Sequence, residues 1–438
     1  MDKTFLIHSF GCKVNQEEGE ELAALFTLQG WQEAVPGANA SLYIVNTCAV
    51  TQMAEKKARS FIRRLRREHP GSLLVVTGCY AQVAATKVAA LPSVDIIAGL
   101  HERANLPALV EQRLRAGQPL IRVSDIAKAT AFQSIGPAKQ QKRARAYLKI
   151  EDGCGQFCHY CIIPSARGPV RSLPLANALA EARELLDAGH RELVLSGIHI
   201  GAYGEDLGVG EDLPTLIEQL LGLSKNFRLR LGSLEPRQFS AKLLRLWQAE
   251  PRICPHLHIP LQSGSDPVLA AMNRNYRTAD YAALLEELRA LRPGCAITSD
   301  VMTGYPGETA ADFAATLDFC AQMTFSRLHV FPYSKRPGTV AATLPQQVPQ
   351  AEKAGRAALL LALGAKLAEA YARSCIGSRL EYLHEQEITL RGQTFYSGHS
   401  GNYLPLALAA VSAPPESLLM VRAKEYRDGY LLCEPLNF

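Results

Sequence analysis

The chain has 438 residues, of which 47% are hydrophobic and 20% charged, and its formal net charge is +5. That length and composition are typical of a globular protein with two or three domains, and they exclude a fibrous, disordered or strongly polycationic chain. The N-terminal apolar run is too short for a signal peptide and no stretch is long enough to cross a bilayer, so we expect a cytoplasmic protein without a membrane partner.

Residues 1–120 alternate short β-rich runs with amphipathic helical stretches, a pattern that predicts an open, mostly parallel α/β sheet. The expected strands are TFLIHSF, SLYIVNT, LLVVTG and VDIIAG. One helix is expected from about Glu17 to Gln29, and a second ends at about Glu68. A third is expected to begin near Ala81, and a fourth runs from about Arg103 to Ala116. Residues 121–144 are polar, basic and weakly periodic, and we interpret them as a linker.

Residues 145–373 hold a second series of alternating strands and helices. Its strand candidates are AYLKI, ELVLSGI, RLRLGS, HLHIP, ITSDVMTG and SRLHVFPY, and a helix is expected from about Ala351 to Arg373. Six such units indicate a partial or full (β/α) barrel with its function at the carboxyl ends of the strands. Residues 374–438 show short alternating runs broken by Gly, Pro and Asn, which predict a small antiparallel barrel.

Basic residues gather in two runs of the chain. The first consists of Lys56, Lys57, Arg59, Arg63, Arg64, Arg66 and Arg67, and the second of Lys139, Lys142, Arg143, Arg145 and Lys149. The plain interpretation of such a run is a solvated helix face. Two runs in a protein of modest net charge favour a polyanionic substrate, because Lys and Arg supply phosphate contacts.

The chain contains eleven cysteines, an odd number that a fully paired disulfide framework does not give. In a reducing compartment, cysteines indicate metal binding or catalysis. Cys154, Cys158 and Cys161 lie in GCGQFCHYC directly after the strand AYLKI, and three thiolates on one tight loop can ligate three irons of a cubane cluster. The fourth iron then stays open to the amino and carboxylate groups of S-adenosylmethionine (SAM).

The alternative for this motif is a zinc site. Tetrahedral zinc normally takes four ligands, usually from paired C-x2-C hairpins, and here only His159, between two of the cysteines, is at hand as a fourth. The spacing C-x3-C-x2-C at the end of the first barrel strand resembles the radical SAM superfamily, as does the aromatic Tyr160. This resemblance implies that electron transfer from the cluster cleaves SAM and releases a 5′-deoxyadenosyl radical.

Three more cysteines stand at equivalent places in the first domain. Cys12, Cys48 and Cys79 each lie between a predicted strand and a helix, in SFGCKVNQ, IVNTCAVT and VVTGCYAQ. The carboxyl ends of parallel strands share one edge of a sheet, so these thiols can converge, and helix N-termini favour thiolate. The hypothesis is a second three-cysteine [4Fe-4S] cluster with one open iron, and three buried structural cysteines are the alternative. The other five cysteines show no ligand spacing and are interpreted as small core or surface residues: Cys254, Cys295, Cys320, Cys375 and Cys433.

Six motifs, in their order along the chain, resemble the methylthiotransferase family of radical SAM enzymes: GCKVNQ, NTCAVT, GCYAQ, DGCGQFCHYCIIPSARGPVRS, TSDVMTGYPGET and FPYSKRPGT. The resemblance implies an N-terminal cluster domain (1–120), a linker (121–144), a radical SAM barrel (145–373) and a C-terminal RNA-binding module of the TRAM type (374–438). Its cofactors are two [4Fe-4S] clusters and SAM. GCKVNQ and CxYCIIPxARGPxRS are similar to the branch that acts on N6-threonylcarbamoyladenosine beside the tRNA anticodon. Glu17 and Ser165 depart from that pattern, where the family often has an aromatic residue and a Tyr.

The resemblance implies a two-cluster reaction. The radical removes hydrogen from carbon 2 of the adenine, and sulfur from the auxiliary cluster, methylated by a second SAM, gives a 2-methylthio derivative at position 37 of tRNA. The hydrogen on that carbon does not ionise easily, so acid–base catalysis is a poor route and cofactor-driven radical chemistry is a plausible one. The implied partners are tRNA through its anticodon loop, an electron donor such as flavodoxin or ferredoxin, and a sulfur donor.

Supporting residues end the barrel strands, where polar groups face the mouth. The candidates for SAM contacts are Tyr160, Ser196, Gly197, Ser233, Glu235, Gln262, Ser263, Asp300 and Gly304, and turn or cap chemistry is the alternative for each. Arg167 and Arg171 are expected to meet tRNA phosphate, the SAM carboxylate or a surface salt-bridge partner. Four C-terminal aromatic residues are available for base stacking or for core packing: Tyr382, Phe395, Tyr396 and Tyr403.

Other functions stay open at this point. The same chemistry can act on N6-isopentenyladenosine in tRNA or on a ribosomal protein. A non-catalytic iron–sulfur RNA-binding sensor forms no 5′-deoxyadenosine from SAM, and a structural zinc protein contains zinc without iron.

Overall fold

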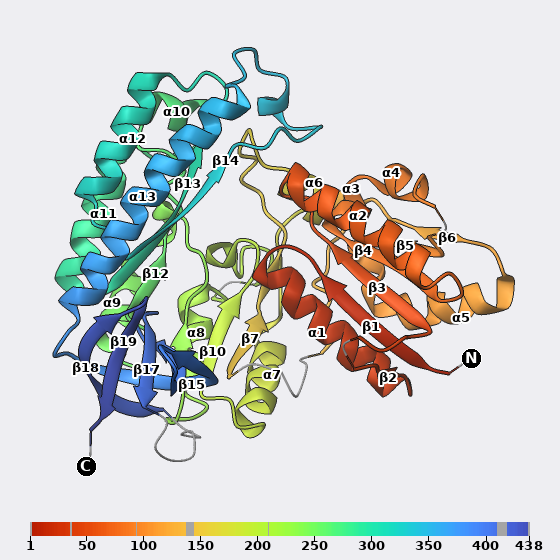
Figure 1. Ribbon diagram of the computed structural model, residues 1–438, viewed down its shortest axis with the longest axis horizontal. Coiled ribbons are helices and arrows are strands. Elements are labelled where there is room, and N and C mark those ends of the chain that lie inside the picture. Colours follow the sequence, from red (N-terminus) through yellow and green to blue (C-terminus); the bar gives the residue numbers. More distant parts are fainter. Residues whose placement is uncertain are drawn as a thin grey trace.

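The computed structural model describes residues 2–35, 37–92, 94–136, 144–208, 210–409 and 418–436. Three bodies follow one another along the chain (Figure 1): an α/β sheet domain, a half-open barrel of parallel strands with helices on its outside, and a small closed β-barrel. The predicted α/β architecture is confirmed. Among the described helices, none is both long and apolar enough to span a lipid bilayer.

The N-terminal sheet has six parallel strands in the order β2-β1-β3-β4-β5-β6. They are β1 (Thr4–Ser9), β2 (Gln32–Glu33), β3 (Leu42–Thr47), β4 (Leu73–Gly78), β5 (Ile96–Ala98) and β6 (Leu120–Arg122). β3 and β4 are buried along their full length, which is why LYIVNT and LLVVTG are almost continuously apolar. The four predicted strands are confirmed, and the short edge strands β2 and β6 are additional.

Helices on both faces of this sheet bury two apolar cores. They are α1 (Lys13–Leu28), α2 (Gln52–Glu68), α3 (Cys79–Val83), α4 (Ala85–Ala89), the 3-10 turn η1 (Leu100–Asn105) and α5 (Leu106–Ala116). The prediction that the first helix begins at about Glu17 is wrong, because α1 begins directly after Cys12. The start of α2 shows the usual capping chemistry, since the Thr51 hydroxyl accepts a hydrogen bond from the Ala54 amide at 3.1 Å.

The predicted linker differs from the structure at its start. β6 still belongs to the N-terminal sheet, and the 3-10 turn η2 (Ile126–Lys128) buries Ile126 in the same core as Ile162. Several apolar side chains thus anchor this otherwise polar run: Ile126 and Ala129 lie in this core, and Phe132 and Ile135 pack against the cores of the barrel and of the sheet. Three residues of the second basic run lie outside the described residues: Lys139, Lys142 and Arg143.

The central part is a barrel of six parallel strands, as predicted. They are β7 (Arg145–Lys149), β10 (Glu192–Ser196), β11 (Arg228–Arg230), β12 (His256–His258), β13 (Ala296–Thr303) and β14 (Arg327–Pro332). They form two sheets, β11-β10-β7 and β12-β13-β14, joined by isolated bridges between Leu229 and Ile253 and between Ser233 and His258. Within the described residues β7 and β14 do not pair, so the barrel is partial.

Helices cover the outside of the barrel (Figure 1) and, with the strands, bury its large apolar core. They are α7 (Leu175–Asp187), α8 (Leu213–Leu221), α9 (Ala241–Ala249), α10 (Asp266–Ala271), α11 (Thr278–Leu291), α12 (Ala310–Gln322) and α13 (Gln350–Ser374). Shorter elements lie near the strand ends: β8 (Glu151–Asp152), α6 (Ile163–Arg167), β9 (Arg171–Ser172), η3 (Ile200–Ala202), η4 (Pro236–Gln238) and η5 (Val340–Ala342). Because strands and helices alternate, the carboxyl ends of all six strands gather at one end of the barrel.

The C-terminal part is a closed five-stranded barrel in the order β15-β16-β17-β19-β18. Its strands are β15 (Arg379–Leu390), β16 (Gln393–Ser400), β17 (Pro405–Ala409), β18 (Leu419–Arg427) and β19 (Tyr430–Pro435). The pairs are antiparallel as expected, except that β17 and β19 are parallel. Tyr382 and Phe395, two residues considered for base stacking, are buried in this barrel.

A loop of the C-terminal barrel is anchored on the central barrel by Tyr403. The Arg230 guanidinium lies 4.6 Å from the centroid of the Tyr403 ring. Arg228 and Arg230 both pair with Glu192 at 2.6 Å and also donate hydrogen bonds to backbone carbonyls of residues 399–401. Tyr403 therefore packs between the two domains, which is the packing role that was the alternative to base stacking.

Candidate functional site

The loop after β8 carries Cys154, Cys158 and Cys161 at the carboxyl end of the barrel strands. All three thiols are partly exposed. Burial raises the pKa of Cys154 to about 11 and that of Cys161 to about 12, and the neighbouring Cys158 thiol adds to both rises. Each thiol thus lies within electrostatic reach of another, as the predicted ligand set requires.

Unusual backbone geometry holds this loop. Gly153 has a φ of +98°, and a Cβ at this position would lie 1.9 Å from the Pro169 carbonyl oxygen, so only glycine fits. Phe157 has a φ of +40° and a 67% exposed side chain. The amide of Gln156 donates to the Cys154 sulfur at 3.5 Å, a contact that favours the thiolate form.

A buried guanidinium contacts the same cysteine set. Arg274 is only 8% exposed and donates from Nη1 to the Cys158 sulfur at 3.4 Å. It also pairs with Glu235 and lies 5.0 Å from the centroid of the Tyr276 ring. The structure thus places a buried positive charge beside one sulfur of this loop.

Cys12, Cys48 and Cys79 follow β1, β3 and β4, three neighbouring strands of the N-terminal sheet. Burial raises the pKa of Cys79 to about 12, the charge of Arg167 opposes that rise, and the Cys12 and Cys48 thiols add to it. The packing is tight, since a Cβ at Gly11 would lie 2.7 Å from the Cys48 sulfur. The structure therefore brings this second trio together at the predicted sheet edge.

Neither cysteine trio forms a site for a single metal ion in the part of the chain that the structure describes. Within the described ranges, no three His, Cys, Asp or Glu side chains are close enough to hold a single metal ion. A cubane cluster has its irons at separate corners, so its thiolates stand farther apart than the ligands of one ion. The trios are convergent sets of thiols rather than closed cages.

Two buried arginines face the second trio. Burial raises the pKa of Cys48, while the charges of Arg167 and Arg336 act to lower it. Arg336 is 3% exposed and pairs with Glu55, yet its Nε and Nη1 atoms have no hydrogen-bond partner among the described residues. Unpaired donors on a buried cation are costly, and an anionic group held by the three cysteines would relieve that cost.

A buried ion network lies between the two cysteine sets. Its acids are Glu18 and Asp152, and its cations are Arg103, Lys149, Arg167 and Arg171. Glu18 accepts from Arg167 Nη1 at 2.6 Å and from Lys149 Nζ at 2.8 Å. Burial works against the ionised form of Glu18, but the charges of Arg103 and Arg167 hold its pKa well below the usual range.

The structure corrects the expected roles of Arg167 and Arg171. Arg167 is 0% exposed, and Arg171 is buried and donates to the backbone carbonyls of residues 167 and 169. Side chains without solvent access do not contact tRNA phosphate, so that expectation is wrong. Arg167 instead donates from Nη2 to Asn15 Oδ1 at 2.7 Å, and the same oxygen lies 3.9 Å from the Cys79 sulfur.

Two predicted SAM contacts lie at the end of β10: Ser196 contacts the N-terminal domain, and Gly197 lies against Glu151 of β8. The Ser196 hydroxyl donates to Glu17 of α1. Burial, reinforced by the charge of Glu21, raises the pKa of Glu17 far above its usual range. A Cβ at Gly197 would approach the Glu151 carbonyl oxygen to 2.9 Å, so this glycine permits a close backbone approach.

The residues predicted to contact SAM at β11, β12 and β13 differ in their surroundings and in their exposure. Glu235 forms the ion pair with Arg274 described above, and Ser233 is exposed. Ser263 is buried 3.2 Å from the Thr316 hydroxyl of α12, so its side chain packs against a helix and does not face the mouth. Asp300 is partly exposed, 3.4 Å from His258 Nε2.

Three buried polar atoms that follow the barrel strands β7, β10 and β12 lack partners within the described chain: Glu151 Oε1, His199 Nδ1 and Gln262 Oε1. Gln262 also has a φ of +64°. Tyr160 packs against an apolar group that includes Met272 and Tyr305. Polar atoms left open beside apolar aromatic surface suit a ligand with both kinds of group.

Sequence reasoning missed several residues of this site. Lys13 follows Cys12 and donates to the Tyr403 hydroxyl at 3.3 Å. His258 and His329 lie with ring centroids 5.6 Å apart inside the barrel. The alternating His residues of HLHIP signal one polar face of a strand, whereas nothing local marks the role of Arg274 or Arg336.

Two families match the chain. The "Radical SAM superfamily" matches residues 148–320, and the "Uncharacterized protein family UPF0004" matches residues 4–99. The first contains Cys154, Cys158 and Cys161, and the second contains Cys12, Cys48 and Cys79. Each cysteine set therefore lies in its own recognised family region.

Curated relatives cover nearly the whole chain. The threonylcarbamoyladenosine tRNA methylthiotransferase MtaB of Bacillus subtilis is 37% identical over 98% of this chain and 94% of its own length. The protein of the same name from Thermotoga maritima is 36% identical over 87% of each chain. The tRNA-2-methylthio-N(6)-dimethylallyladenosine synthase of Nocardia farcinica is 36% identical over 87% of this chain and 77% of its own.

Solved structures with the same fold are more distant. The radical S-adenosylmethionine methyltransferase TsrM from Kitasatospora setae superposes with a TM-score of 0.55 at 15% identity, over 78% of this chain and 75% of its own. At that identity the likeness concerns the fold alone.

Proposed function

The chain belongs to the methylthiotransferase family of radical SAM enzymes, and we propose that it converts N6-threonylcarbamoyladenosine beside the tRNA anticodon to its 2-methylthio derivative. The observation that carries the proposal is the pair of convergent cysteine trios, one in each family region, joined by buried ions. The substrate follows the name of the relative that matches 98% of the chain.

Membership of this family implies SAM and a [4Fe-4S] cluster, and we assign the cluster to Cys154, Cys158 and Cys161. When bound, this cluster supplies the electron that cleaves SAM and starts radical chemistry. The residues present fit such a group, because Arg274 and the Gln156 amide already donate to two of the three sulfurs. Hydrogen bonds to cluster sulfurs are a usual means of tuning Fe–S sites.

SAM contacts are proposed for the polar atoms left open beyond the ends of β7, β10 and β12. Glu151, His199 and Gln262 each present a buried atom without a protein partner, and a bound amino acid moiety would satisfy them. Tyr160 and its apolar neighbours offer a surface for the adenine. Ser196 and Glu235 are proposed to act on SAM indirectly, because their side chains already contact Glu17 and Arg274.

A second cluster is proposed on Cys12, Cys48 and Cys79, where sulfur is delivered. The unpaired donors of the buried Arg336 and the charge of Arg167 support an anionic group at this place. Cys12 is exposed, so an incoming sulfur donor can reach this trio. An electron donor such as flavodoxin or ferredoxin, and tRNA through its anticodon loop, complete the proposed partners.

The Arg274–Glu235 pair is expected to set the reduction potential of the first cluster, because local charge and hydrogen bonds to sulfur govern such potentials. Arg274→Gln removes a positive charge and a donor beside Cys158, so the midpoint potential should fall. Glu235→Gln leaves the arginine charge uncompensated, so the potential should rise.

A redox titration of the reconstituted protein, followed by electron paramagnetic resonance, measures both shifts. Arg245→Gln, on the exposed face of α9, is the control and should leave the potential unchanged. Shifts of the same sign in Arg274→Gln and Glu235→Gln would argue against this electrostatic role.

The proposed function is tested on tRNA from a strain that lacks this gene. Mass spectrometry of its nucleosides is expected to show loss of 2-methylthio-N6-threonylcarbamoyladenosine, restored by the wild-type gene. Unchanged levels reject the proposal, and loss of the methylthio derivative of isopentenyladenosine assigns the other branch. Failure of the reduced, reconstituted protein to form 5′-deoxyadenosine from SAM would indicate the sensor instead.

A further inference from the structure

The inner face of the central barrel carries three histidines. On β12, Leu257 packs into the barrel core beneath the helices, so His256 and His258 face inward by the alternation of a strand. Leu328 packs into the same core on β14 and turns His329 inward. His256 is 5% exposed, His258 is partly exposed and His329 is exposed. The inner face is therefore buried at the start of β12 and open to solvent at His329.

Tyr403 of the C-terminal barrel covers the buried part of this face. Its ring centroid lies 4.9 Å from that of His256 and 5.1 Å from the Arg145 guanidinium, in addition to the Arg230 contact described above. We call these four residues the barrel floor. Two buried atoms of the floor, His256 Nδ1 and Arg145 Nη1, have no hydrogen-bond partner among the described residues.

Lys13 brings a further cation to the barrel floor. It directly follows Cys12 and is the first residue of α1, which lies beside β7 (Figure 1). Its Nζ atom donates to the Tyr403 hydroxyl at 3.3 Å. Burial lowers the pKa of His256 and of His329, and the charge of Lys13 adds to both decreases. The lysine thus reaches from the second cysteine trio to the inner face of the barrel.

Lys13 differs from the other cations of the floor because it has no carboxylate partner. The two arginines do have one each: Arg230 pairs with Glu192 at 2.6 Å, and Arg145 pairs with Glu385 at 2.9 Å. Asp300, an acid of the neighbouring strand β13, lies 3.4 Å from His258. Within the described ranges no carboxylate lies at ion-pair distance from Lys13, which is exposed. Its charge is available to an anionic ligand.

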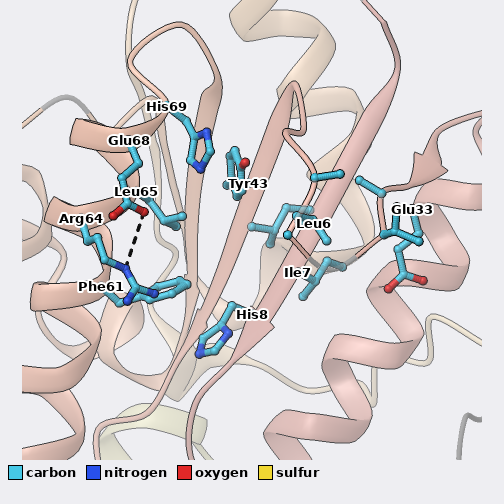
Figure 2. A pocket seen from close by; sticks show the side chains of 15 residues that line it. Leu6, Ile7, His8, Glu33, Tyr43, Phe61, Arg64, Leu65, Glu68 and His69 are labelled. Carbon is cyan, nitrogen blue, oxygen red and sulfur yellow. Dashed lines mark ion pairs between the residues drawn. The ribbon is translucent and has the colours of Figure 1, made fainter.

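The groove on the N-terminal domain offers no such cation. Its volume is about 860 Å³, and it is lined by β1, β3, α2 and the segment that includes β2 (Figure 2). Arg64, the one arginine of its lining, lies 3.8 Å from Glu68, the pair dashed in Figure 2, and Glu33 adds a second carboxylate. An anionic group of the substrate therefore fits the barrel floor better than this groove.

We propose that Lys13 binds the carboxylate of the threonylcarbamoyl group on the target adenosine, and that this group lies along the inner face beside His258 and His329. The inference rests on the proposed function, which supplies the substrate. A threonylcarbamoyl group ends in a free carboxylate, whereas an isopentenyl group carries no charge, so this lysine favours the first over the second. An RNA phosphate would also pair with a lysine, but Lys13 stands beside a cysteine of the proposed sulfur site, where the modified base itself has to lie.

The test compares two synthetic anticodon stem-loop RNAs in binding to the full-length, reconstituted protein. One carries N6-threonylcarbamoyladenosine, and the other carries its threonine amide, which is uncharged. Wild type is expected to bind the acid about tenfold or more tightly than the amide, because bound RNA would exclude water from a charge-assisted hydrogen bond. Lys13→Met should bind the acid about tenfold or more weakly and the amide like wild type, so the preference disappears. Lys13→Arg keeps the charge and should keep part of the preference.

The control is Lys366→Met, which removes a lysine charge at an exposed site of α13 and should leave both affinities unchanged. Equal binding of acid and amide by the wild-type protein overturns the inference without any variant. An equal loss for both RNAs in Lys13→Met also overturns it, since the lysine then meets the RNA backbone. Formation of the methylthio product on the acid RNA is measured separately, and its absence rejects the proposed function.

Discussion

Replacing Arg167 with Gln is expected to lower the free energy of unfolding by about 3 kcal/mol. Removing one partner of a buried ion pair typically costs about 3–5 kcal/mol, since it leaves uncompensated charge. The lower end applies here because Glu18 and Asp152 keep Lys149 as a partner. The substitution also removes the hydrogen bond from Arg167 to Asn15, so the contact between the barrel and the N-terminal domain weakens.

The measurement is the midpoint of thermal unfolding of the reconstituted protein. A decrease of about 3 kcal/mol corresponds to a midpoint lower by roughly 6–12 °C for a domain of the size of this barrel. Arg64→Gln is the matched control, since it breaks an exposed pair with Glu68, and such a change stays within about 0.5 kcal/mol. Equal midpoints for Arg167→Gln and Arg64→Gln would show that the buried network does not hold the two parts together.

Cys154→Ala is expected to abolish formation of 5′-deoxyadenosine from SAM, while Cys48→Ala should retain it and lose only the methylthio product. The two variants should differ because the two cysteines lie in different sites: Cys154 is in the barrel loop, and Cys48 is at the edge of the N-terminal sheet. Cys433→Ala changes a partly buried cysteine of the C-terminal barrel, and it should leave both products unchanged.

Chromatography of reactions started with a chemical reductant quantifies both products. Continued SAM cleavage by Cys154→Ala would remove this cysteine from the reaction. Loss of SAM cleavage in Cys48→Ala would mean that the two trios do not work separately.

The positions of the six cysteines were predictable because each depends on local pattern and on a general property of parallel sheets. Cys12, Cys48 and Cys79 follow apolar runs that are typical of strands, and the carboxyl ends of such strands meet at one edge. The spacing of Cys154, Cys158 and Cys161 lies within one loop, so no long-range information is needed. Their assignment as ligands stays a proposal.

The partners of buried charges were not predictable in the same way. Arg167 pairs with Glu18, 149 residues away in sequence, and many other acids and arginines in the chain were equally plausible partners. Arg274 reaches Cys158 across 116 residues. Such pairs depend on how whole domains pack, which local periodicity does not report.

Two smaller errors have local causes. α1 begins at Lys13 without a side-chain cap, so the usual Ser, Thr, Asp or Asn signal was absent and the helix was expected to begin later. Tyr403 sits in a loop with a φ of +66° and inserts between arginines of another domain. An aromatic residue in a β-domain gives no local sign that its neighbours belong elsewhere.

The central claim is that the chain holds two separate four-iron clusters, one on each cysteine trio, and an anaerobic count of iron and sulfide tests it most directly. We expect about eight irons per wild-type chain and about four in each of Cys48→Ala and Cys154→Ala, since each variant loses one four-iron cluster. A wild-type chain with only about four irons, unchanged in Cys48→Ala, would contradict the claim.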